Sequence, residues 1–179
     1  LFYYGWTFFW EFVPVTVMHT IGYPAHNIGY IYMTGALSYV ILSLFITRKL
    51  MTKIAISLLL PLSIGFLAVC IGITGEMSSS PQLLYLVVVQ QFFLSCIYPL
   101  FSTYISMNSS EESQGRSLGM LNAVKAMACS LGPLCSGLFF SLSSLVPIII
   151  GVATLSLSSL FAFRFFALQK KAIEVEENF

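Results

Sequence analysis

Six long apolar runs cover almost the whole chain from Leu1 to Gln169, and turn residues or charges separate them. Each run is about as long as the roughly 20 residues that a helix needs to cross a bilayer. The runs are continuously apolar rather than alternating, which favours helices over the strands of a membrane barrel. The pattern predicts transmembrane helices at about residues 1–18, 28–46, 54–73, 83–107, 118–142 and 148–168, with a cytoplasmic tail at 169–179.

Composition points to the same class of protein. Hydrophobic residues make up 58% of the 179 residues and charged residues 8%, and the mean hydropathy is +0.90. A soluble domain of this size carries far more charge on its surface. A net charge of +1 leaves no basic face for a nucleic acid. We therefore expect an all-α integral membrane protein that is surrounded by the lipid bilayer.

Lysine and arginine fall in the loops on one side of the predicted bundle. These cations are Arg48, Lys49, Lys53, Arg116, Lys170 and Lys171. The loops of the opposite side, around 19–27, 74–82 and 143–147, contain no Lys or Arg. The positive-inside rule then predicts that both termini are cytoplasmic, in a plasma or inner membrane. The acidic end with Glu174, Glu176 and Glu177 is expected to be solvated.

Polar side chains recur at helical spacing in four of the six runs. The fourth run carries Gln91, Ser95, Tyr98 and Ser102, which fall on one face of a helix. The other stripes are Tyr4, Thr7 and Glu11 in the first run, Asn27, Tyr30, Thr34 and Ser38 in the second, and Asn122, Lys125, Cys129, Gly132 and Ser136 in the fifth. Such faces are costly in lipid and should meet protein or water. Hydrogen bonding within a static bundle is one interpretation; four stripes favour a central cavity.

Four of these polar residues are placed at a similar depth by counting along the chain. Glu11, Ser38, Tyr98 and Lys125 each lie nine or ten residues from a predicted inner helix end. That is roughly 15 Å, about half of a hydrocarbon core of about 30 Å, where transporters bind their substrates. We expect Glu11 to carry a proton, and Lys125 to be its counter-ion or to hold an anionic substrate. A purely structural Glu11–Lys125 bridge is the alternative.

Neither a metal site nor a cofactor is expected. The four cysteines lie inside the apolar runs, and the histidines His19 and His26 lie in an outer loop. An intramembrane serine protease is rejected, because Ser136-Gly137 lacks a preceding glycine and no histidine follows residue 26. We therefore expect no enzymatic activity.

Proline and glycine residues carry a resemblance to a known family. The order of Pro99, Glu111–Arg116 with Gly115 and Gly119, and Gly132-Pro133 with Gly137 is similar to the tenth and eleventh helices of major facilitator superfamily transporters. Tyr4-Gly5-Trp6 with Pro14, followed by Gly29 and Gly35, resembles the seventh and eighth helices of drug:proton antiporters in that superfamily. We interpret Ser113–Gly119 as a tight cytoplasmic turn, and Gly132-Pro133 as a closely packed kink.

The resemblance implies the C-terminal six-helix half, a 3+3 inverted repeat, of a twelve-helix transporter. Leu1 begins inside an apolar run, so we expect an N-terminal six-helix half upstream. Alternating access driven by protons, in the direction of efflux, is the implied function. Lys125 departs from the antiporter pattern and hints at an anionic substrate, and the loop 46–50 lacks the Gly and Asp usual for gating. Proton-coupled uptake of a small organic anion or nutrient and a non-transporting remnant are the alternatives.

Overall fold

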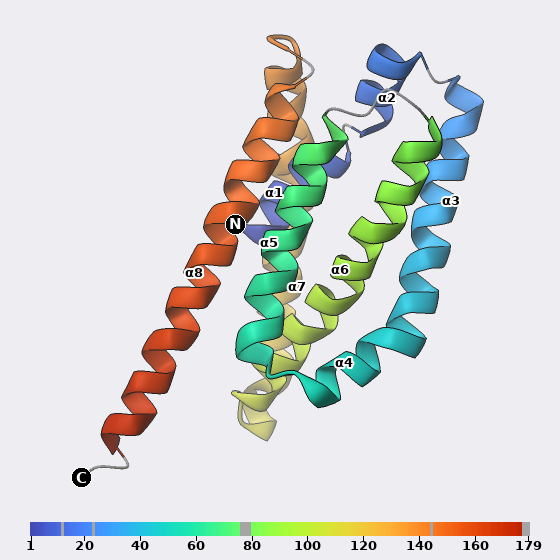
Figure 1. The fold of residues 1–179 in the computed structure, drawn as a ribbon. Coiled ribbons are helices and arrows are strands. Elements are labelled where there is room, and N and C mark those ends of the chain that lie inside the picture. Colours follow the sequence, from blue (N-terminus) through green and yellow to red (C-terminus); the bar gives the residue numbers. More distant parts are fainter. Residues whose placement is uncertain (12, 23, 76–79, 144, 177–179) are drawn as a thin grey trace.

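The computed structural model describes residues 1–11, 13–22, 24–75, 80–143 and 145–176. Within them the chain is a bundle of helices without a β-strand (Figure 1). The elements are α1 (Phe2–Trp10), α2 (Val13–Ile21), α3 (Ala25–Leu42), a π-helical turn (Ser43–Thr47), α4 (Arg48–Lys53), α5 (Ile56–Thr74), α6 (Ser80–Met107), α7 (Glu111–Phe140) and α8 (Val146–Glu176).

Among the described residues, five helical segments are long and apolar enough to cross a membrane. They are Ile28–Lys53, Ile56–Thr74, Gln82–Met107, Glu111–Phe140 and Val146–Lys171. These segments correspond to the second to sixth predicted spans, and the expectation of an all-α membrane protein is confirmed. The first predicted span, 1–18, is instead divided between α1 and α2.

Pro14 explains why the first predicted span is divided. Proline has no N–H to bond the carbonyl four residues earlier, and its ring clashes with that carbonyl. The residue four before Pro14 is Trp10, where α1 ends. Pro14 itself lies in the first turn of α2, where a helix has no use for the missing N–H. The continuous helix predicted over 1–18 was therefore wrong.

The second predicted span is longer than expected and contains its own irregular turn. α3 continues through the π-helical turn into α4, so Arg48 and Lys49 lie on a helix rather than in a loop. The turn leaves Thr47 buried, and the helical segment ends at Ile54 and Ala55, which have extended backbones. The loop after the second span was predicted too early in the chain, because it was predicted from the charges of Arg48 and Lys49. Lysine and arginine are good helix formers.

The tight turn predicted over Ser113–Gly119 is also wrong, because α7 already begins at Glu111. Ser110 has an extended backbone and precedes the helix, and Glu111 and Glu112 occupy its first turn. Negative side chains there interact favourably with the helix dipole. The helix continues through Gly115 and Gly119, where glycine lowers helix stability without preventing it.

α1 is held tightly between α7 and α8. A Cβ at Gly5 would fall on the side chain of Thr154 and lie 3.2 Å from Leu155 Cγ. Gly151 is the matching glycine on α8. A Cβ at Gly151 would lie 3.3 Å from the Gly5 carbonyl oxygen. α5 packs mainly on α8 and α6, and α3 packs on α6. The glycines allow the close helix contacts that replace hydrophobic driving force inside a membrane.

The N-terminal end lies about midway along the bundle, whereas α4 and the C-terminal end lie toward one end and α2 toward the other (Figure 1). The ring of Phe2 accordingly packs against Tyr98 and Phe101 in α6. The expectation that Leu1 lies at the cytoplasmic end is therefore wrong.

α8 extends to Glu176, so most of the predicted tail is helical. Glu76, Glu177 and the side chains of His19, His26 and Asn27 lie outside the described residues.

Candidate functional site

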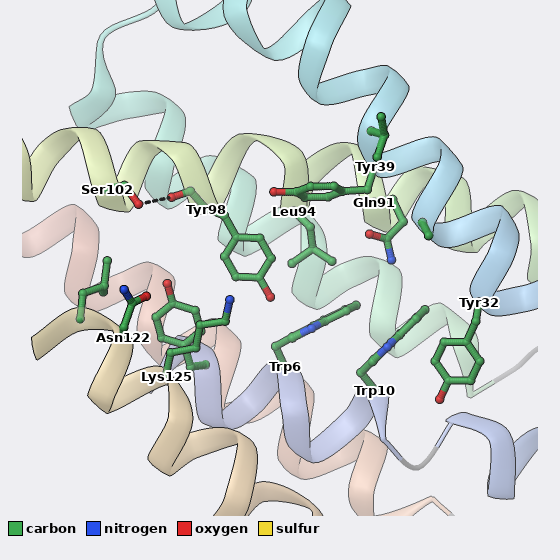
Figure 2. A pocket seen from close by; sticks show the side chains of 14 residues that line it. Trp6, Trp10, Tyr32, Tyr39, Gln91, Leu94, Tyr98, Ser102, Asn122 and Lys125 are labelled. Carbon is green, nitrogen blue, oxygen red and sulfur yellow. Dashed lines mark hydrogen bonds between the residues drawn. The ribbon is translucent and has the colours of Figure 1, made fainter. Parts of the chain in front are cut away.

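A cavity of about 540 Å³ lies between α1, α3, α6 and α7 (Figure 2). These are the four segments on which the sequence carries polar stripes, and α5 and α8 contribute nothing to its described lining. The lining residues are Tyr3, Trp6, Trp10, Tyr32, Ala36, Tyr39, Val40, Gln91, Leu94, Tyr98, Ser102, Leu121, Asn122 and Lys125. Its volume falls within the range of roughly 300–1,000 Å³ that is typical of small-molecule sites.

Four of the predicted site residues meet at this cavity: Gln91, Tyr98, Asn122 and Lys125. Gln91 and Tyr98 project from one face of α6, and Ser102 follows one turn later on the same face. Asn122 and Lys125 are one turn apart on α7. The helical spacing seen in the sequence is what brings these side chains to one side of each helix.

Lys125 lies against an aromatic ring rather than a carboxylate. Its Nζ is 4.9 Å from the centroid of the Tyr98 ring, within the distance of a cation–π interaction. Within the described part of the chain, Lys125 is the one formally charged side chain among the residues that line the cavity. The cavity therefore presents a positive charge at one wall.

Glu11 directly follows α1, at the end that leads to α2, and it is not among the described residues that line the cavity with Lys125. Counting its depth from Leu1 was misleading, because Leu1 lies midway along the bundle and not at the inner face. The Glu11 carboxylate is exposed and interacts electrostatically with the phenol of Tyr32, which lines the cavity. Glu11 directly follows Trp10, which lines the cavity, but Glu11 is not itself among the lining residues.

The other predicted polar residues serve the helices themselves. Ser95 is fully buried; its hydroxyl donates to the Phe92 carbonyl oxygen and lies 2.8 Å from the Thr47 hydroxyl in the π-helical turn. The Ser38 hydroxyl donates to the Thr34 carbonyl oxygen at 2.6 Å, and neither residue lines the cavity. For these three residues, hydrogen bonding within the bundle describes the structure better than a cavity role.

On α1 the cavity takes a different helix face from the predicted one. Thr7 is buried against α7. Its hydroxyl donates to the Tyr3 carbonyl oxygen and is 3.0 Å from the Ala128 carbonyl oxygen. Tyr3, Trp6 and Trp10 line the cavity instead. Their spacing of three and four residues was present in the sequence, but it is the spacing of any apolar helix face.

Six aromatic residues line the cavity, and we call them the aromatic wall: Tyr3, Trp6, Trp10, Tyr32, Tyr39 and Tyr98. Trp6 and Trp10 stack, with ring centroids 5.0 Å apart and an interplanar angle of 18°. Tyr3 and Tyr98 stack at 5.9 Å and 13°. The two stacks hold flat ring faces and polar edges at the cavity, since tyrosine and tryptophan combine both.

Gln91 reaches the cavity because glycine faces it on α3. A Cβ at Gly35 would lie 3.3 Å from Gln91 Nε2 and 3.4 Å from Val87 Cγ1, which is tight for either contact. The missing side chain leaves room for the amide, which points into the open space in Figure 2. A neutral donor and acceptor therefore faces the cavity beside the aromatic wall.

The predicted gating and packing residues fall into three groups. Gly132 is in close contact, because a Cβ there would fall on Thr7 and lie 3.1 Å from the Phe8 backbone nitrogen. The second group is exposed on α7: Gly115 and Gly119 have open space where a Cβ would be, and Arg116 and Gly137 are exposed. The third group consists of Pro99 and Pro133, which lie inside continuous helices. Among these residues, Gly132 is the one that limits how closely two helices approach.

The described residues contain no group of three or more His, Cys, Asp or Glu side chains that could hold a metal ion. An aromatic cavity between helices, with one ammonium group and two amides at its wall, can bind an organic molecule through ring contacts, hydrogen bonds and charge. Together with the spanning helices, these features define an integral, multi-pass membrane protein with a polar, aromatic cavity between its helices.

Comparison with known families identifies that class more closely. The model of the Major Facilitator Superfamily matches residues 1–178, and the chain belongs to this family. Members of the superfamily are transporters rather than enzymes, so the function of this protein is membrane transport of a small molecule. No curated protein sequence matches the chain significantly.

Proposed function

We propose that the protein is a proton-coupled secondary transporter that binds its substrate in the cavity between α1, α3, α6 and α7. The observation that carries this proposal is the convergence of Gln91, Tyr98, Asn122 and Lys125 on one cavity between four helices. These polar side chains would be unfavourable in lipid, and they line a cavity that is large enough for a small molecule.

We infer that the chain acts as the C-terminal six-helix half of a twelve-helix transporter, with the 3+3 repeat that the family resemblance implies. In this proposal an N-terminal half closes the open side of the cavity, and the two halves rock to give alternating access. The end of the bundle with Arg48, Lys49 and Lys53 would then be cytoplasmic, as the positive-inside rule requires.

Glu11 is the proposed proton carrier. It is the one carboxylate within the predicted spans, and it follows Trp10, whose ring meets Tyr32 edge-on at the cavity. A proton taken up there changes the charge next to the binding site, which allows proton and substrate occupancy to be coupled. Efflux is the direction supported by the resemblance to drug:proton antiporters.

A second candidate is proton-coupled uptake of a small organic anion. Lys125 favours it, because a positive charge at the cavity wall attracts anions and repels the lipophilic cations that many exporters carry. Both candidates use the same cavity and the same coupling carboxylate, so they differ in substrate and direction only.

A pH-jump flux assay on the full-length protein in liposomes tests this function. Organic anions and lipophilic cations are screened separately, with each sign of the pH gradient, and protein-free liposomes are the control. Gradient-driven release of a cation supports efflux, and gradient-driven uptake of an anion supports the second candidate. Flux that persists without a gradient and never responds to one would contradict proton coupling.

A further inference from the structure

The charge at the cavity wall restricts which molecules fit. Lys125 brings a positive charge to the cavity, and no carboxylate stands among its described lining residues. The ring of Tyr98 compensates the ammonium in part, through its negative face. A charge between membrane helices is costly unless a partner neutralises it. A bound anion would supply that partner, whereas a bound cation would add a second uncompensated charge.

The shape of the aromatic wall adds a second restriction. Tyr32 meets Trp10 edge-on, with centroids 5.4 Å apart at 89°, and Tyr39 meets Tyr98 at 6.2 Å and 62°. The Trp6–Trp10 and Tyr3–Tyr98 stacks supply flat faces beside these edges. Aromatic rings prefer offset-stacked or edge-to-face contacts with other rings, so this wall favours a planar ligand.

The remaining lining groups suit a small acidic head group. The amides of Gln91 and Asn122 can both donate to oxygen. Gln91 on α6 and Lys125 on α7 both line the cavity and are both drawn in Figure 2. A carboxylate has two oxygens and can accept from the ammonium and from an amide together.

We propose that the substrate is a small planar organic anion, an aromatic carboxylate in the simplest case. Its carboxylate binds Lys125 with help from the amides of Asn122 or Gln91, and its ring packs against the Trp6–Trp10 stack. This assignment rests on the proposed function in one respect, namely that the cavity is the substrate site. It adds the substrate class and holds for either direction of transport.

The chain contains a built-in reporter for this proposal. Its two tryptophans, Trp6 and Trp10, both line the cavity. Tryptophan emission of the full-length protein in lipid nanodiscs therefore reports on cavity occupancy, provided that any upstream tryptophans are replaced by phenylalanine. The probes are benzoate, cyclohexanecarboxylate, benzyl alcohol and benzylamine, which separate the contributions of the ring and of the charge.

We expect benzoate to quench or shift this emission saturably, and to bind more tightly than each of the other three probes. Lys125→Met should weaken benzoate binding by about tenfold or more, because a charge-assisted contact is lost. Lys125→Arg should retain binding within a few-fold. The matched control is Lys53→Met on α4, an exposed lysine outside the cavity lining, which should bind as the wild type does.

The proposal is overturned if benzylamine binds as tightly as benzoate, if Lys125→Met leaves the benzoate affinity unchanged, or if benzoate produces no saturable signal. Equal affinity for cyclohexanecarboxylate would remove the planar part of the assignment. Binding is measured without a gradient, so its result is separate from that of the flux assay. Binding without flux would contradict the proposed transport, and flux of another class of substrate without benzoate binding would contradict this inference.

Discussion

Lys125 Nζ on α7 lies 4.9 Å from the centroid of the Tyr98 ring on α6. The interaction joins two helices across the cavity lining and holds the ammonium at the wall, where a ligand can reach it. Tyr98 is itself supported by a stack with Tyr3 on α1. Three helices thus determine where the positive charge of the cavity is held.

Replacing the Tyr98 ring should therefore weaken the binding of an anion through Lys125. A cation–π contact contributes about 0.5–2 kcal/mol, so Tyr98→Leu should lower anion affinity by several-fold. Tyr98→Phe keeps the ring and should stay close to the wild type. The measurement is the titration of tryptophan emission with benzoate. Equal losses in the two variants would show that the hydroxyl, and not the ring face, matters.

Gly132→Ala should destabilise the contact between α1 and α7. The new Cβ would fall on Thr7, and overpacking of this kind costs about 1–3 kcal/mol. Gly119→Ala is the matched control, because it adds the same methyl group to the same helix in open space. Thermal unfolding in detergent, followed by circular dichroism, should show a lower midpoint for Gly132→Ala alone.

A second substitution makes the same test specific to the contact. Thr7→Ala removes the hydroxyl of Thr7, which is the atom nearest to the Cβ of Gly132→Ala, so the double variant should regain part of the lost stability. If Gly132→Ala and Gly119→Ala unfold at the same temperature, the close approach of α1 and α7 is contradicted.

The hydrogen bond between Thr47 and Ser95 should hold the π-helical turn against α6. Both side chains are buried and their hydroxyl oxygens are 2.8 Å apart. Thr47→Val keeps the shape and removes the hydroxyl, and it should cost about 0.5–1.5 kcal/mol. Thr52→Val is the control, since the Thr52 hydroxyl is exposed and bonds only within α4.

A double-mutant cycle of Thr47→Val with Ser95→Ala isolates this hydrogen bond from other effects of the two changes. A coupling energy near zero, from chemical or thermal unfolding, would show that the two hydroxyls do not support each other. A favourable coupling of about 0.5 kcal/mol or more is expected, as found for hydrogen bonds between membrane helices.

Glu11→Gln should uncouple transport from the proton gradient. The amide keeps the size of the side chain but cannot exchange a proton, so driven accumulation should be lost while exchange of substrate for substrate continues. Glu111→Gln, at the exposed start of α7, is the control and should keep driven flux. Liposome flux with and without a pH gradient measures both. Full accumulation by Glu11→Gln would remove Glu11 from the coupling mechanism.

Much of this architecture can be predicted from hydrophobic patterning. Five of the six predicted spans correspond to long apolar helices, and four striped segments surround the cavity. On α6 and α7, polar spacing identified Gln91, Tyr98, Asn122 and Lys125, because long polar side chains inside a span need a polar environment.

The face of α1 that lines the cavity and the depth of Glu11 were predicted wrongly, for identifiable physical reasons. Thr7 looked like a cavity residue, but a threonine hydroxyl can bond the carbonyls of its own helix, and here it also bonds Ala128. Tyr3, Trp6 and Trp10 were not predicted to line the cavity, because an aromatic face has the same spacing as any buried face. The division of the span at Pro14 and the mid-bundle position of Leu1 then displaced Glu11 from its counted depth.

The central claim is that the transported molecule binds in the cavity between α1, α3, α6 and α7. Ala36 lines this cavity on α3, so Ala36→Phe should fill part of it, whereas Ala153→Phe adds the same ring on an exposed position of α8. The most direct measurement is substrate exchange by both variants in liposomes, at matched levels of folded protein. We expect exchange to be abolished in Ala36→Phe and retained in Ala153→Phe. Exchange by Ala36→Phe at the wild-type rate would contradict it.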